Sequence, residues 1–188
     1  MLFRSEARDW IKDNLHFDAD MLVSTFETTI RNLGGLLSAY DWSGDSLFLD
    51  KAVDLGNRLI KVYDTPMGIP WSHINLKTGE GRNGFTGEDS TTIAEVGSLQ
   101  VEFRFLSEVT QNPIYAANAE SAFDVLRSLK SNNGMYLTNV ANTKKVQDPK
   151  SLSSGDYYTF AAQAGKKNII LLLLFFSSFC IFHFIPSI

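Results

Sequence analysis

Glu27 and Arg31 have the residue types and the spacing to do chemistry together. They stand four residues apart in STFETTIRNLGGLLSAYDWSGD, a stretch whose apolar residues recur with helical period. A glutamate and an arginine at i, i+4 meet on one helical face, where they commonly form a surface ion pair worth about 0.2–0.5 kcal/mol. The alternative is a carboxylic acid at the edge of a pocket, with the arginine controlling its charge or gripping a polar substrate. Spacing alone leaves both interpretations open.

Two adjacent glycines follow the pair in the same helical stretch. On a helical wheel Gly34 and Ser38 share the stripe of Glu27 and Arg31, beside the apolar stripe. Each mid-helix glycine costs roughly 1 kcal/mol relative to alanine. Close approach by another helix or by a ligand is the usual compensation, so the glycines favour the pocket interpretation.

Glu95, in STTIAEVGSLQVEF, is a second candidate acid. It falls in the first turns of an expected helix, directly after a long loop. An acid at a helix start is commonly there because the helix dipole favours it. A binding role and an ordinary helix-start role are therefore both open for Glu95.

Composition excludes several classes of function. The net charge is -4 and the pI is near 5.3, and no basic face is apparent, which argues against nucleic acid as the main partner. The single cysteine, Cys180, excludes a disulfide framework and a thiol-based metal site. The histidines are scattered without ligand spacing, at His16, His73 and His183.

The periodicity predicts an all-α fold with helices over 4–15, 22–40, 46–63, 91–109 and 113–129. Residues 64–89 are rich in Gly, Pro, Thr and Asn and predict a long, functional or disordered loop. The N-terminus lacks a secretory apolar core and looks like the middle of a helix. Short strands are expected near MYLTNV and YYTF.

A weak internal repeat at an offset of 67 residues relates Ser43, Phe48, Ala52 and Leu59 to Thr110, Tyr115, Ala119 and Leu126. Such a repeat indicates helical hairpins arranged in an array, perhaps closed into a toroid. Two hairpins would not close, so the repeat predicts that the chain is part of something larger.

The stretch FETTIRNLGGLLSAYDWSGDSLFLDKAVDLGNRLIKVYDTPMGIPWSHINLKTG resembles the class I α-1,2-mannosidases, glycoside hydrolase family 47. STTIAEVGSLQVEFRFLSEVTQNPIY continues the resemblance, and EARDWIKDNLHFD fits the segment before it. The resemblance covers roughly residues 5–164. It implies an (α/α)7 barrel of helical hairpins, of which 1–164 would be one part.

The resemblance also implies an activity and a cellular setting. Members remove terminal α-1,2-linked mannose from N-glycans in the endoplasmic reticulum or Golgi, with inversion and with a bound Ca²⁺, and some act in disposal of misfolded glycoproteins. Glu27 matches the family's general acid in F-E-x-T-I-R. Arg31 matches the arginine of that motif, which contacts the sugar and the acid. Glu95 matches the acid of A-E-x-x-S-x-Q-x-E-F, part of the sugar-binding floor, and the partner implied is a high-mannose glycan or glycoprotein.

The resemblance stops after Ala164. The family's next motif, A-D-S-x-Y-E-Y-L, has an aspartate where this chain has Gly165 in FAAQAGKKNIILLLLFF. The base carboxylate, further hairpins and the C-terminal threonine that helps hold Ca²⁺ have no counterpart. We therefore expect an inactive fragment with no metal ligand of its own.

Residues 165–188 have two interpretations. Gly-Lys-Lys can be encoded by GGTAAGAAA, which contains a splice-donor sequence, so the tail would be translated intron. Alternatively, 168–188 comprise 21 residues without Asp, Glu, Lys or Arg, which is long enough to form a transmembrane helix behind Lys166 and Lys167. In that case the chain would be a non-catalytic, membrane-anchored module that binds glycan or protein.

Overall fold

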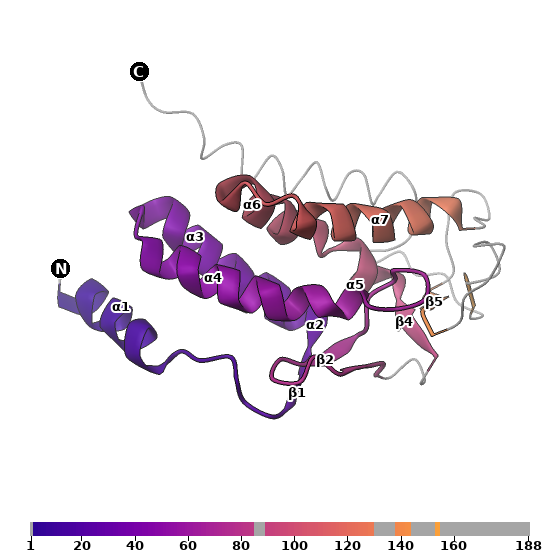
Figure 1. Ribbon diagram of the computed structural model, residues 1–188, viewed down its shortest axis with the longest axis horizontal. Coiled ribbons are helices and arrows are strands. Elements are labelled where there is room, and N and C mark those ends of the chain that lie inside the picture. The colour runs from indigo at the N-terminus through magenta and orange to yellow at the C-terminus, as the bar shows by residue number, and fades with distance from the viewer. Residues whose placement is uncertain (1, 85–88, 130–137, 144–152, 155–188) are drawn as a thin grey trace, which may run out of the picture.

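The computed structural model describes residues 2–84, 89–129, 138–143 and 153–154. Helices dominate, and two helical hairpins lie against each other with short strands at one end (Figure 1). The helical elements, including the π-helix η1 and the 3₁₀-helix η2, are α1 (Leu2–Asn14), α2 (Thr25–Glu27), η1 (Thr28–Leu33), α3 (Gly34–Ser43), α4 (Ser46–Leu59), η2 (Ile60–Tyr63), α5 (Ile93–Gly97), α6 (Gln100–Thr110) and α7 (Ile114–Ser128).

The two hairpins, α3–α4 and α6–α7, are the units of the predicted repeat. The first turns at Gly44, whose φ of 65° suits glycine and whose N–H donates to the Tyr40 carbonyl over 2.7 Å. Asp45 then caps α4 by accepting from the Leu47 N–H over 3.1 Å. The second hairpin turns at Gln111, which also has positive φ, at 55°. The helix bounds agree with the offset repeat, because α6 begins 66 residues after α3 and α7 begins 68 residues after α4.

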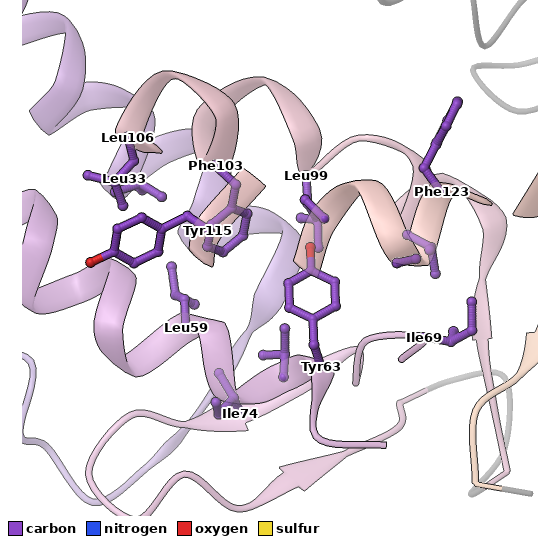
Figure 2. Close-up of a cluster of buried hydrophobic side chains, with 14 of the residues drawn as sticks. Leu33, Leu59, Tyr63, Ile69, Ile74, Leu99, Phe103, Leu106, Tyr115 and Phe123 are labelled. Atoms are coloured by element: carbon purple, nitrogen blue, oxygen red, sulfur yellow. The ribbon is translucent and has the colours of Figure 1, made fainter. Parts of the chain in front are cut away.

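The hydrophobic core lies between the hairpins, as the predicted stripes require. Figure 2 shows Tyr63, Leu99, Phe103 and Tyr115 among its members. The rings of Tyr63 and Phe103 meet edge to face, with centroids 5.8 Å apart. Helical periodicity in the expected helices 46–63 and 113–129 predicts an inward apolar stripe on each, and the structure confirms both. The buried members are Ala52, Leu55, Leu59 and Val62 on α4 and η2, and Tyr115, Ala119, Ala122, Leu126 and Leu129 on and just after α7.

Short strands correct the all-α prediction, so the fold is mostly helical. One antiparallel sheet joins β1 (Leu22–Ser24), β2 (His73–Asn75) and β3 (Gly81–Arg82). A second joins β4 (Ser90–Thr92), β5 (Asn139–Ala141) and β6 (Ser153–Ser154). The predicted loop 64–89 therefore contains two strands. The strand expected near MYLTNV is β5 in part, whereas YYTF lies outside the described residues.

Two predicted helices were wrong in detail. The helix expected over 22–40 begins as β1. Leu22, whose spacing from Phe26 fits the apolar stripe of that expected helix, pairs with Asn75 on an edge strand instead and is 42% exposed. The helix expected over 91–109 is two helices, α5 and α6. They are separated at Ser98, whose hydroxyl donates to the Ala94 carbonyl over 2.6 Å and competes with the backbone ladder.

Among the described residues no helix is long and apolar enough to cross a membrane. The predicted apolar helix at 168–188 lies outside the described residues, so both interpretations of the tail stay predictions.

Replacing either of two helical glycines by alanine should change the free energy of unfolding, in opposite directions at the two positions. Gly35 is exposed, and a Cβ there would meet no atom of the described residues within 4 Å. A Cβ on Gly56 would clash with Leu106 Cδ2, and Leu106 is fully buried with little room to move. We expect Gly35→Ala to raise the free energy of unfolding by about 0.5–1 kcal/mol. We expect Gly56→Ala to lower it by about 1–2 kcal/mol, because overpacking outweighs helix propensity.

Urea unfolding of both variants beside the wild type measures these changes. A destabilising Gly35→Ala would contradict the open surface that the structure shows over this residue.

Candidate functional site

Glu27 and Arg31 meet at the start of the first hairpin, as the sequence predicted. Glu27 ends α2, whose first turn is capped by Ser24, the hydroxyl of which accepts from the Glu27 N–H over 3.2 Å. Arg31 Nε donates to Glu27 Oε2, and the two side chains are 73% and 45% exposed, respectively. This ion pair raises the pKa of Arg31 above its ordinary value. An exposed pair contributes little to stability, so stability alone does not account for it.

The helix that carries the pair is not a plain α-helix. Thr28–Leu33 form a π-helix, a rare element that is often found at functional sites. Thr29 is fully buried within it, and its hydroxyl donates to the Thr25 carbonyl over 2.8 Å. The same carbonyl also accepts the Thr28 N–H, so it takes two hydrogen bonds where the helical register changes. Apolar periodicity gave no sign of the change.

Thr25 fastens this turn to the segment before β2. Its N–H donates to the Ser72 carbonyl over 2.8 Å, and its hydroxyl donates to the Trp71 carbonyl over 2.7 Å. Thr25 is 1% exposed, so both bonds are shielded from water. The position of Glu27, two residues on, is therefore set by a contact with a distant part of the chain.

Glu95 has a structural role in addition to any binding role. With Thr92 it forms a capping box at the start of α5: Thr92 Oγ1 accepts from the Glu95 N–H over 3.2 Å. Glu95 Oε2 in turn accepts from the Thr92 N–H at 3.2 Å, from the Thr92 hydroxyl at 2.9 Å and from the Thr91 hydroxyl at 3.1 Å. No described residue donates to Oε1. One oxygen of this carboxylate is thus held in place, and the other accepts no hydrogen bond from the described residues.

Glu102 is a third acid, which the sequence reasoning missed. Its place on α6 is three residues after Leu99 and four before Leu106, and so on the apolar stripe of that helix. That placement, an acid among inward-facing apolar residues, was the signal that could have found it. Its Cγ and Oε1 lie 3.5 Å from where a Cβ on Gly34 would be, so the side chain covers Gly34. Gly34 therefore has a packing neighbour within the chain, whereas Gly35 has none.

Burial dominates the electrostatics of Glu102. Desolvation raises its pKa from 4.5 to about 7, although a hydrogen bond from its own backbone opposes the shift. Its Oε2 is buried and has no hydrogen-bond partner among the described residues. Charging a carboxyl group with one buried, unbonded oxygen is costly, so Glu102 retains a proton to a much higher pH than an exposed glutamate.

Metal binding finds no support in the described ranges. Within them, no group of three His, Cys, Asp or Glu side chains could hold a metal ion. The residues present do not fit the Ca²⁺ site that the resemblance implies for the family.

Comparison with known proteins identifies the family. The model of glycosyl hydrolase family 47 matches residues 4–162. A mannosyl-oligosaccharide 1,2-alpha-mannosidase of Candida albicans is 47% identical over 131 residues, which cover 70% of this chain and 23% of that protein. The human endoplasmic reticulum mannosyl-oligosaccharide 1,2-alpha-mannosidase is 55% identical over 105 residues, covering 56% of this chain and 15% of that one.

A solved structure agrees. The alpha-1,2-mannosidase from Trichoderma reesei matches with a TM-score of 0.65 and 30% identity, over 74% of this chain and 32% of that one. The chain thus spans about a quarter or less of the length of these two curated relatives. Family model, relatives and fold agree, and the chain belongs to glycosyl hydrolase family 47.

Proposed function

We propose that this chain carries the acid-bearing part of a glycosidase that hydrolyses terminal α-1,2-linked mannose on high-mannose N-glycans, with inversion. The observation that carries the proposal is the exposed Glu27–Arg31 pair on a π-helix, in a chain whose relatives are named α-1,2-mannosidases. One relative is named for the endoplasmic reticulum, which supports placing the protein in the secretory pathway.

In this proposal Glu27 is the general acid. An inverting glycosidase protonates the leaving oxygen with one carboxylic acid, while a second carboxylate activates water on the opposite face of the sugar. Glu27 must carry a proton when it meets the glycosidic oxygen. Arg31 is exposed and has room to turn from Glu27 toward a sugar hydroxyl when substrate arrives. That movement would release the carboxyl group for proton transfer.

Glu95 binds the sugar in this proposal. Its Oε1 faces no donor among the described residues, and a carboxylate oxygen is a strong acceptor for sugar hydroxyls. The base carboxylate is not assigned to a described residue. A Ca²⁺ requirement follows from family membership alone, and no step is routed through the ion.

Binding of α-1,2-mannobiose to the full chain tests the proposal. We expect Arg31→Ala to weaken binding about tenfold or more, because a charge-assisted hydrogen bond contributes about 1.5–3 kcal/mol. Titration followed by amide chemical shifts gives the dissociation constants. The matched control is Arg104→Ala, which removes an exposed arginine paired with Glu120 on the other hairpin. Equal loss in both variants, or no binding by the wild type, would remove support for a sugar site at Arg31.

A further inference from the structure

Ser72 is the residue at which the two candidate acid segments meet. It is 3% exposed, and it stands one residue before β2. Its carbonyl accepts from the Thr25 N–H, which fastens the turn that bears Glu27. Its hydroxyl lies 2.9 Å from Thr91 Oγ1 and 3.3 Å from Glu95 Oε2. Backbone and side chain of one residue thus contact both sides of the site.

The number of hydroxyl protons decides which group donates and which accepts among Ser72, Thr91 and Glu95. Each hydroxyl has one proton to donate. Thr91 Oγ1 donates to Glu95 Oε2, so it can accept the proton of Ser72 Oγ over the shorter of the two distances. The resulting chain runs from Ser72 through Thr91 to Glu95. Bonds in such a chain polarise one another, and this one ends on a carboxylate oxygen.

The same bonds decide which oxygen of Glu95 is held. Every donor to Glu95 among the described residues reaches Oε2: Thr91 and Thr92 bond to it directly, and Ser72 acts on it through Thr91. The Thr92 bonds belong to the capping box and orient Glu95 only within its own helix. The Ser72–Thr91 and Thr91–Glu95 bonds instead fix Glu95 relative to a segment outside that helix, because the Ser72 carbonyl is bonded to the turn that bears Glu27.

We propose that Ser72 is a positioning residue that sets Glu95 against the turn bearing Glu27, through Thr91, and so presents Glu95 Oε1 to the sugar. The part of this inference that concerns sugar rests on the proposed function. The part that concerns the position of Glu95 does not. Ser72 touches no reacting atom in this role and acts only through Glu95.

The experiment reads the position of Glu95 directly. The ¹³C resonance of the Glu95 side-chain carboxyl carbon and the hydrogen exchange of the Thr92 amide are measured in the full chain. We expect Ser72→Ala to move the carboxyl resonance and to speed exchange at Thr92. Ser107→Ala is the matched control, because it removes a buried hydroxyl that accepts from the Ala116 N–H over 2.8 Å at the distant second hairpin. It should leave both signals unchanged.

A second pair of variants tests the relay without touching Ser72. Thr91→Val removes the hydroxyl and keeps the side-chain shape, whereas Thr91→Ser keeps the hydroxyl. We expect the valine variant to reproduce the resonance change of Ser72→Ala and the serine variant to retain the wild-type resonance. An unmoved Glu95 resonance in both Ser72→Ala and Thr91→Val would overturn the inference.

Binding of α-1,2-mannobiose separates the two proposals. With the relay broken, we expect the dissociation constant to rise about fivefold, the effect of one hydrogen bond. If the wild type does not bind mannobiose while the resonance still moves, the proposed function fails and the positioning role of Ser72 stands. If the wild type binds and Ser72→Ala binds equally well, with the resonance unmoved, the positioning role fails and the proposed function stands.

Discussion

Replacing Glu102 by glutamine should make this protein markedly more stable at neutral pH and leave it nearly unchanged at pH 4.5. The glutamate pKa is raised from 4.5 to about 7 on folding, so the folded state binds its proton more tightly than the unfolded state does. Stability linked to this group is therefore complete below pH 4.5 and is lost as the pH rises to about 7. Over that window the loss amounts to about 3 kcal/mol. Glutamine has nearly the same shape and no charge to desolvate, so the Glu102→Gln variant does not lose this stability as the pH rises.

The measurement is the free energy of unfolding in urea from pH 4.5 to 8, with Glu102→Gln compared with the wild type at each pH. Subtraction removes the contribution of every other titrating group. Glu108→Gln is the matched control, because Glu108 is an exposed acid on the same helix. Parallel curves for the wild type and Glu102→Gln would show that Glu102 is charged in the folded protein, contrary to its buried, unpaired setting.

The second large effect concerns Glu27 and catalysis. We expect a chimera in which residues 4–162 replace the matching part of the Candida albicans mannosidase to release mannose from α-1,2-mannobiose. Within that chimera, Glu27→Gln should lower kcat about 10²–10⁴-fold, because glutamine cannot transfer a proton. KM should change far less, since the amide keeps the shape of the side chain.

Two controls make the chimera informative. Glu80→Gln removes an exposed acid that pairs with Arg82 and has no role in the proposed chemistry, so it should leave kcat unchanged. A chimera that is inactive while folded would count against this segment as a functional mannosidase part. A chimera that is active and insensitive to Glu27→Gln would exclude Glu27 as the acid.

Sequence reasoning predicted the helical hairpins because helical periodicity is visible among residues close together in the sequence. The buried positions of α4 and α7 follow one period, and the 67-residue offset repeats that period with equivalent residues. It also paired Glu27 with Arg31, because i, i+4 neighbours meet in any helix. The roles proposed for Glu27, Arg31 and Glu95 remain predictions.

What sequence reasoning missed depends on contacts between distant segments. Leu22 continues the helical period of its neighbours, and only its pairing with Asn75 makes it part of a strand. Nothing near Ser72 in the sequence signals that its hydroxyl reaches Glu95, 23 residues on. Glu102 was passed over although its place on the apolar stripe of α6 was a signal, because periodicity does not show whether the carboxyl group stays buried or turns toward water.

The bonds that fasten Thr25 to the segment before β2 also bear on the order of folding. They join residues 46 and 47 positions apart, whereas each helical hairpin closes over a short turn. Closing a long loop has a larger entropic cost, so we expect contacts of this kind to form late compared with local ones. The smallest stretch that contains Thr25, the Glu27–Arg31 pair and Glu95 runs from residue 25 to residue 95. Neither hairpin alone contains it, and the geometry of the site is completed only after the helices that support it have met.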